Sequence, residues 1–289
     1  MTSSVHSAPI MDEAGTAGGA RRPWAVVLGA SVGSGAAIAK AVAAEPGLNV
    51  FSVHRGNHPE AATEVQRDIQ ALGSRAHFRV GDAAAAEAAA DGAAELAEVA
   101  GPKSVQLFVH SLASASLGKL TGSGHLAPRQ MLKTFDVMAH SFVYWVQELV
   151  ERELLAPGAR IVGLTNPLDE SLVLQCGLIA ATKAALEGYA RALALELGPK
   201  GYRVNLLKFS TVITPAVAAV YGKERLEAIR RSHERFMPAR RMCTVEEVGK
   251  VVSFLAGPDA EYFNGATIDF SGGMMLGMVD VLLRDPSDA

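Results

Sequence analysis

The sequence predicts an α/β protein with a doubly wound sheet of about seven parallel strands and helices on both faces. Short apolar segments alternate with helical segments from Pro23 to the end of the chain, which is the order expected when helices connect parallel strands. The strand-like segments are apolar throughout instead of alternating, as in strands buried on both faces. A glycine-rich stretch lies between the first of these strands and the first helix.

Each predicted strand is a short run rich in β-branched, aromatic or other apolar residues. These runs are Trp24–Leu28, Asn49–Val53, His77–Val80, Val105–Val109, Arg160–Leu164, Arg203–Leu207 and Ala266–Phe270. Helices are predicted where good helix formers dominate and glycine or proline closes the run. They are Ala36–Ala44, Ala61–Leu72, Ala83–Val99, a long helix from Arg129 to Leu155, a helix around Lys183, and Val245–Leu255. The segment Val212–Phe236 is predicted to combine a loop with a helix.

The length of 289 residues fits one domain of this kind. Residues 1–22 are rich in Gly, Ala, Ser and Thr and are predicted to be a flexible N-terminal segment, followed by a single domain over 23–289. Hydrophobic residues make up 49% and charged residues 20%, and the net charge is −3. This balance indicates neither a nucleic-acid surface nor a membrane-binding face.

The two cysteines, Cys176 and Cys243, have no CxxC spacing. We therefore expect neither a metal site nor a disulfide framework. No apolar run reaches transmembrane length, and the N-terminus lacks the apolar core of a signal peptide. A cytoplasmic protein is the resulting expectation.

The stretch Gly29-Ala-Ser-Val-Gly33-Ser-Gly35 follows the first strand and opens a helix. Glycines in this place allow a tight turn and close approach of the backbone to a pyrophosphate, whose charge meets the helix N-terminus. The pattern predicts a Rossmann-type dinucleotide site that includes Gly29, Ser31, Gly33 and Gly35.

The second strand is followed by His54 and Arg55, where an NAD-preferring site usually has an acid. The forked guanidinium of Arg55 suits a 2′-phosphate, which favours NADPH over NADH. The alternative is that Arg55 is a solvated loop residue. Asp82 follows the third strand, and it is placed either to meet the adenine edge or to cap the next helix.

The chain resembles the short-chain dehydrogenase/reductase family from about Pro23 to Met278. The resemblance lies in the glycine spacing of residues 29–35 and in ATKAALEGYARALALELGPKGYRVN, residues 181–205. His110-Ser-Leu-Ala113 and Phe135-Asp-Val-Met-Ala-His-Ser-Phe142 look like the enoyl-acyl-carrier-protein reductase branch. The tail fits the same branch through Pro238-Ala-Arg-Arg-Met, Glu247-Val-Gly249 and Ser271-Gly-Gly273.

This resemblance implies an NAD(P)H-dependent oxidoreductase acting on a small-molecule or carrier-linked acyl substrate, as in fatty acid or polyketide biosynthesis. It implies that Lys183 holds the nicotinamide ribose and that Ser111 and Thr214 belong to the cofactor site. It also implies a homotetramer or dimer, with helices around 129–155 and 178–197 at the interface.

One feature of the family is missing, namely the tyrosine that acts as the acid. Most members place it four residues before the lysine, where this chain has Ile179. Enoyl reductases place it seven residues before, and often have another seventeen before, where this chain has Cys176 and Asn166. The Pro-Gly-type turn after the sixth strand is also replaced, by Phe209-Ser-Thr-Val-Ile213.

Thr165, Asn166 and Cys176 are the local candidates to replace this acid. The amide of Asn166 can donate to an oxyanion, although the residue also suits a turn before Pro167. Cys176, with Lys183 favouring its thiolate, could act as acid or nucleophile, or it could be a small buried hydrophobe. Tyr221 and His233 lie in the segment predicted to cover the substrate, and either could reach in from a mobile lid.

Two further groups have both a functional and a structural interpretation. His110 and His125 lie near the end of the fourth strand, where ligands bind in open α/β sheets, and His110 is interpreted as structural. The helix residues 142–145, Phe-Val-Tyr-Trp, suit an acyl or aromatic substrate, or the core and subunit packing.

Three functions are consistent with these residues. The favoured one is NADPH-dependent reduction of a conjugated, enoyl-thioester-like substrate with a rearranged acid. The second is a non-reductive dehydratase, isomerase or cyclase in which Cys176 or His233 is the working group. The third is a nucleotide-binding protein without turnover.

Overall fold

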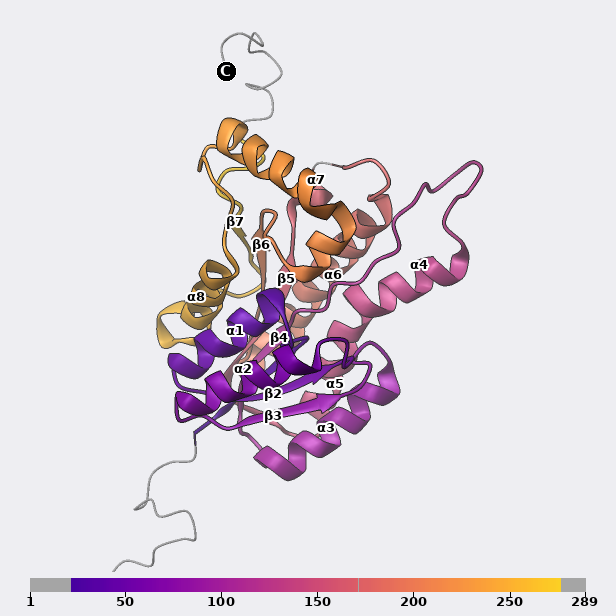
Figure 1. Ribbon diagram of the computed structural model, residues 1–289. Coiled ribbons are helices and arrows are strands. Elements are labelled where there is room, and N and C mark those ends of the chain that lie inside the picture. The colour runs from indigo at the N-terminus through magenta and orange to yellow at the C-terminus, as the bar shows by residue number, and fades with distance from the viewer. Residues whose placement is uncertain (1–21, 171, 277–289) are drawn as a thin grey trace, which may run out of the picture.

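The computed structural model describes residues 22–170 and 172–276, and its centre is a seven-stranded parallel sheet (Figure 1). The strand order is β3-β2-β1-β4-β5-β6-β7. The strands are β1 (Trp24–Leu28), β2 (Asn49–His54), β3 (Ala76–Val80), β4 (Val105–His110), β5 (Leu155–Thr165), β6 (Arg203–Phe209) and β7 (Thr267–Phe270). The predicted fold class is confirmed. The order reverses between β1 and β4, which opens the crevice where such sheets bind ligands.

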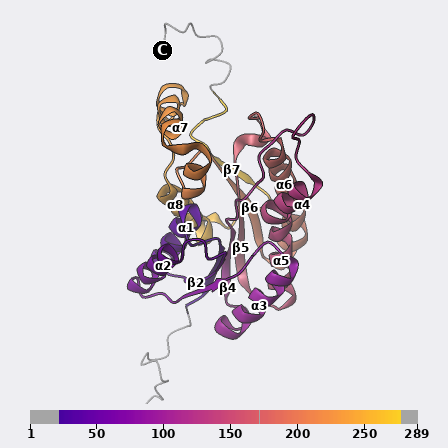
Figure 2. The ribbon, with the colours of Figure 1, turned by 45° about the vertical axis from the view of Figure 1, so that its right-hand side comes forward.

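Helices cover both faces of the sheet, and Figure 2 shows the two layers. One layer contains α1 (Gly33–Ala44), α2 (Pro59–Ala71) and α8 (Val245–Ala256). The other contains α3 (Ala86–Ala100), α4 (Pro128–Phe135), α5 (Ser141–Glu151) and α6 (Gly177–Leu197). Alternate residues of each central strand point into the two cores, because successive side chains of a strand face opposite sides. In β6, Val204 and Leu206 pack into the core beneath α6, whereas Leu207 packs into the other.

The two edge strands differ from the expectation that all strands are buried on both faces. Every residue of β1 and β2 is buried, but β3 and β7 are only partly buried. An edge strand has one neighbour and is covered incompletely by the flanking helices. On β3, Val80 is exposed, and Arg79 pairs with Glu95 of α3.

The predicted helix from Arg129 to Leu155 is wrong at its C-terminal end and is not uniform. It consists of α4, the π-helical turn η1 (Asp136–His140) and α5, which ends at Glu151. Glu153 has a positive φ of 52°, a conformation that cannot continue a right-handed helix. Leu155 instead begins β5, which is longer than predicted and ends at Thr165.

The segment after β6 is a loop followed by α7 (Pro215–Phe236), which lies beyond the end of β6 in Figure 1. Non-helical angles at Gly222 divide α7 into two parts. Three short 3₁₀ helices complete the structure: η2 (Pro167–Asp169), η3 (Gly198–Lys200) and η4 (Pro258–Ala260).

The predicted N-terminal segment lies outside the described residues except for Arg22. The Arg22 guanidinium donates a hydrogen bond of 2.7 Å to the Gly73 carbonyl oxygen. Within residues 22–170 and 172–276, no helix is long and apolar enough to cross a membrane.

Candidate cofactor site and active site

The loop between β1 and α1 is shaped by close backbone contacts that require glycine. A Cβ on Gly35 would meet the backbone carbonyl of Gly29, with the carbonyl carbon 2.9 Å away and its oxygen closer still. Gly29 has a φ of +80°, and a Cβ there would lie 2.9 Å from the Ser111 carbonyl oxygen at the end of β4. These contacts hold the loop directly over the ends of β1 and β4.

A cavity of about 390 Å³ lies at this loop. Every residue predicted to bind the cofactor except Lys183 lines it, namely Gly29, Ser31, Gly33, Gly35, His54, Arg55, Asp82, Ser111 and Thr214. Segments at the ends of β1, β2, β3, β4 and β6 therefore meet at this cavity, as expected for the carboxyl edge of an open parallel sheet.

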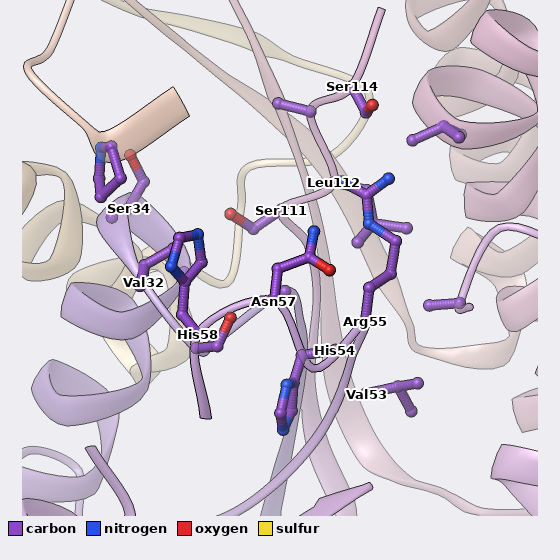
Figure 3. Close-up of a pocket in the computed structure, with 18 of the residues that line it drawn as sticks. Val32, Ser34, Val53, His54, Arg55, Asn57, His58, Ser111, Leu112 and Ser114 are labelled. Carbon is purple, nitrogen blue, oxygen red and sulfur yellow. The ribbon is translucent and has the colours of Figure 1, made fainter. Parts of the chain in front are cut away.

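The residues that follow β2 form one wall of this cavity (Figure 3). Arg55 and Asn57 point toward the segment that contains Ser111, and His58 points toward the glycine loop. Asn57 and His58 were not predicted from the sequence. Their position directly after β2, with His58 as the N-cap of α2, is the signal that could have found them.

The His54 ring points away from Arg55 and Asn57 in Figure 3. Its Nδ1 accepts a hydrogen bond from the Gly56 amide at 3.2 Å, and burial lowers the pKa of His54 below its usual value. His54 is therefore neutral at neutral pH and shapes the turn. Positive charge at this wall comes from Arg55.

Asp82 and Thr214 close the cavity from two other segments. Of the two alternatives for Asp82, helix capping does not hold, because the N-cap of α3 is Ala85. The Asp82 carboxylate instead accepts from the Ala84 amide at 3.2 Å. Thr214 is the N-cap of α7, and a Cβ on Gly33 would lie 3.1 Å from its methyl carbon. The start of α7 thus rests on the glycine loop.

These residues fit a dinucleotide phosphate group. The N-cap of α1, Val32, makes no side-chain capping bond, so the first amides of that helix are available to an anion in the cavity. The missing side chains of Gly33 and Gly35 bring the backbone within reach of such a ligand. Ser31 and Ser34 add hydroxyl groups to the same wall.

Lys183 does not line the cavity but lies nearby, buried beneath the end of the sheet. It is 5% exposed, and its Nζ donates a hydrogen bond of 2.7 Å to the Leu164 carbonyl oxygen of β5. Burial lowers the pKa of Lys183 to about 8. Burial, and then the positive charge of Lys183, lower the pKa of His110 to about 3. His110 is therefore neutral, and its Nε2 donates to Ser141 Oγ at 2.8 Å, which agrees with a structural role.

Thr165, Asn166 and Cys176 surround the start of α6 and the end of β5, but none lines the cavity. Thr165 is the buried last residue of β5. Asn166 caps η2, since its Oδ1 accepts from the Leu168 amide at 3.2 Å. This bond occupies the amide oxygen and leaves the amide nitrogen as a donor.

Cys176 is the N-cap of α6 and is 7% exposed. Burial raises the pKa of its thiol. The expectation that Lys183 favours a thiolate here is wrong, because removal from water dominates the environment of the sulfur. The packing interpretation of Cys176 fits the structure.

We therefore predict that Cys176→Ala leaves turnover within about twofold of the parent chain, because burial disfavours the thiolate nucleophile and the side chain does not line the cavity. Steady-state rates and a thermal unfolding curve of the two proteins test this. A large loss of activity in a variant that still folds would contradict the packing role. Cys243→Ala, which changes the other free thiol, is the matched control.

The other residues considered for catalysis or substrate contact are also held in place by structural contacts. His233 is buried in α7, with its Nδ1 bonded to the Ile229 carbonyl oxygen at 2.8 Å. Tyr221 lies under the guanidinium of Arg225, and His125 bonds to the Gly122 carbonyl oxygen in an exposed loop. Phe142 and Trp145 are fully buried in the core, which excludes them from direct substrate contact. Among the described residues, no group of His, Cys, Asp and Glu is placed to hold a metal ion.

A parallel seven-stranded sheet with a glycine-shaped cavity at its carboxyl edge is the Rossmann-type architecture. Residues 29–275 match the family model described as Enoyl-(Acyl carrier protein) reductase. The chain belongs to this family, within the short-chain dehydrogenases/reductases, whose members here are NAD(P)H-dependent reductases.

Individual relatives agree with this assignment. The 1-cyclohexenylcarbonyl-CoA reductase of Streptomyces collinus is 25% identical over 89% of this chain and 88% of its own length. The NADH-dependent enoyl-[acyl-carrier-protein] reductase FabI of Escherichia coli K12 is 27% identical over 61% of this chain and 66% of its own. A short-chain dehydrogenase from Burkholderia cenocepacia, solved with NADP, has 28% identity and a TM-score of 0.77 over 88% of this chain and 97% of its own.

Proposed function

We propose that this protein is an NADPH-dependent reductase of a conjugated, enoyl-thioester-like substrate. The preference for NADPH over NADH rests on the residues that follow β2. Arg55 faces the cavity there, and no acidic residue follows the strand. A guanidinium there pairs with a 2′-phosphate, whereas an acid would bind the ribose hydroxyl of NADH and repel that phosphate.

Two relatives support the proposal. The Streptomyces protein is named as a reductase of a cyclohexenylcarbonyl thioester, and the Burkholderia structure contains NADP. The Escherichia coli relative is named for NADH, so the preference for NADPH rests on the residues of this chain.

We also propose that the protein forms a dimer or tetramer. Leu132 on α4 and Leu195 on α6 are exposed apolar residues on the helices expected at the interface, which supports this assembly.

The site residues suit conjugate reduction better than reduction of an isolated ketone. A bound nicotinamide would supply a hydride to the substrate, and negative charge would then build on the thioester oxygen. The Asn166 amide nitrogen is the donor proposed to face that oxygen, because its own oxygen is held by Leu168. Losing one such donor slows catalysis by about a hundredfold or more. An enolate held in this way can take its proton from water, so a tyrosine acid is not required.

Lys183 also has a role in the proposed reaction. Its ammonium is oriented by the Leu164 carbonyl oxygen and is buried at the same edge of the sheet. It is proposed to hold the nicotinamide ribose and to bring positive charge to the reacting end of the site.

The non-reductive alternative is weakened by the surroundings of its two working groups. The Cys176 thiol is buried with a raised pKa, and His233 is buried with one ring nitrogen bonded to the backbone. A nucleotide-binding protein without turnover would show cofactor binding but no reaction, and the experiment below separates it from a reductase.

The first test is calorimetric titration with NADPH and with NADH, followed by NADPH oxidation in the presence of crotonyl-CoA as a simple enoyl thioester. Binding together with oxidation supports the proposal. Binding without reduction of any conjugated thioester favours the protein without turnover. Failure to bind either cofactor would refute the reductase.

We predict that Arg55→Ala weakens NADPH binding by about tenfold to a hundredfold, because a charge-assisted hydrogen bond contributes roughly 1.5–3 kcal/mol. NADH binding is expected to change by less than about twofold, since NADH lacks the 2′-phosphate that the guanidinium binds. Titrations of both cofactors measure this difference. Arg67→Ala, an exposed arginine on α2 outside the cavity, is the control. Equal losses for both cofactors would remove the basis for choosing NADPH.

A further inference from the structure

A buried lysine lies at the carboxyl end of β6, beside the candidate active site. The Lys208 side chain is 8% exposed. Lys208 pairs in the sheet with Thr165, the residue before Asn166, and adjacent strands lie about 4.8 Å apart. Val204 and Leu206 of the same strand face the core beneath α6. Since side chains alternate along a strand, Lys208 faces that side too.

The position of the ammonium is fixed by the turn that begins at Asn166. Lys208 Nζ forms an ion pair with the carboxylate of Glu170. Glu170 closes the turn, because its amide donates to the Pro167 carbonyl oxygen at 3.1 Å. Asn166 opens the same turn through its bond with Leu168. A buried cation is therefore held within one short turn of the proposed oxyanion donor.

Stability does not account for this pair. A buried ion pair gains little over well-packed apolar residues, because removing two charges from water offsets their attraction. The Glu170 side chain is 46% exposed and stays in contact with water. The Lys208 side chain, at 8% exposure, is therefore the strongly desolvated partner of the pair. A desolvated charge at the carboxyl edge of a parallel sheet lies where ligands bind, and there it acts on a substrate with little screening from water.

We propose that Lys208 stabilises the anionic, enolate-like form of a carbonyl substrate and so takes over the electrostatic part of the missing tyrosine's task. Glu170 holds the ammonium against the 166–170 turn. The substrate class rests on the proposed function, but the electrostatic role requires only a carbonyl compound that forms an enolate.

The test uses acetoacetyl-CoA, whose enolate has its own ultraviolet absorption band, so the measurement needs no turnover. The purified chain, with NADP⁺ present, is titrated with acetoacetyl-CoA and the enolate band is recorded. We expect the band to appear with the parent chain, with Lys208→Arg and with Glu170→Gln, which keep the positive charge. We expect Lys208→Met to lose it and to reduce kcat with crotonyl-CoA about a hundredfold.

The controls separate an electrostatic role from a structural one. If the pair only tethers the turn, Glu170→Gln and Lys208→Met would reduce the band alike. Arg79→Met removes another strand cation from an ion pair on β3, which four strands separate from β6 in the sheet, and is expected to leave the band unchanged. Should Lys208→Met fail to fold, the double variant Lys208→Met/Glu170→Gln removes both charges and replaces it.

The outcomes also separate this inference from the proposed function. An enolate band that depends on Lys208, without oxidation of NADPH by any enoyl thioester, would refute the reductase and support the role of Lys208. Reductase activity that survives unchanged in Lys208→Met, or an enolate band that persists in it, would overturn the inference and leave the reductase intact.

Discussion

Replacing Gly35 with alanine is expected to reduce NADPH-dependent turnover by about a hundredfold, since a shift of about 1 Å in a binding element has effects of that size. The new Cβ would overlap the Gly29 carbonyl, which is rigid backbone and cannot rotate away. The loop must therefore move off the ends of β1 and β4, and the amides of α1 move with it. Overpacking of this kind also lowers the free energy of unfolding by about 1–3 kcal/mol.

The matched control for this substitution is Gly188→Ala in α6. A Cβ there has open space around it, and alanine favours a helix over glycine by up to about 1 kcal/mol. Calorimetric titration with NADPH and thermal unfolding of both variants are the measurements. NADPH affinity that is normal in Gly35→Ala would mean that the cofactor does not approach this loop.

Replacing Lys183 with methionine is expected to reduce turnover by about a hundredfold while making the fold more stable. The activity falls because the variant loses the group proposed to hold the ribose and to bring charge to the site. Stability rises because a buried ammonium with a pKa of about 8 instead of 10.5 opposes folding by about 3 kcal/mol at neutral pH. The lost hydrogen bond to Leu164 offsets roughly 1 kcal/mol of this gain.

The pH dependence gives this prediction a definite sign. Between pH 8 and 10.5 the unfolded chain keeps the Lys183 proton while the folded chain releases it. The unfolded state then binds more protons, so stability rises with pH in this window. The penalty is fully present below pH 8 and is relieved toward pH 10.5. Denaturant titrations should show the advantage of Lys183→Met shrinking over that range, and an advantage that grows would contradict the burial of a charged lysine.

Local patterns were sufficient for most of the fold and for the residues that line the cavity. The apolar runs placed all seven strands, because a strand buried between two helical layers needs apolar side chains on both faces. The glycine loop was identifiable because its steric requirement is met by residues close in sequence, Gly29 and Gly35. The end of the long helix was missed, since the positive φ at Glu153 depends on Leu154 and Leu155 entering the sheet core.

The candidate catalytic residues were harder to assign, because their properties depend on burial and on partners distant in sequence. Lys208 comes directly after the predicted strand Arg203–Leu207 and was not singled out from the sequence, because only the folded chain brings Glu170 to it. Cys176 had both a reactive and a packing interpretation from the sequence, and His54 was placed only in the cofactor site. Desolvation, which follows from the packing of the whole domain, raises the pKa of Cys176 and lowers the pKa of His54, and so favours the neutral form of both.

The sequence by itself therefore determined the parallel sheet, the glycine loop, and the absence of tyrosine at positions 166, 176 and 179. These are consequences of residue type and spacing along the chain. The tertiary structure decided which groups carry charge at the carboxyl edge of the sheet, namely Arg55 at the cavity wall and the buried Lys183 and Lys208. The reason is physical: a side chain's protonation and orientation depend on its distance from water and from other charges, and folding sets both.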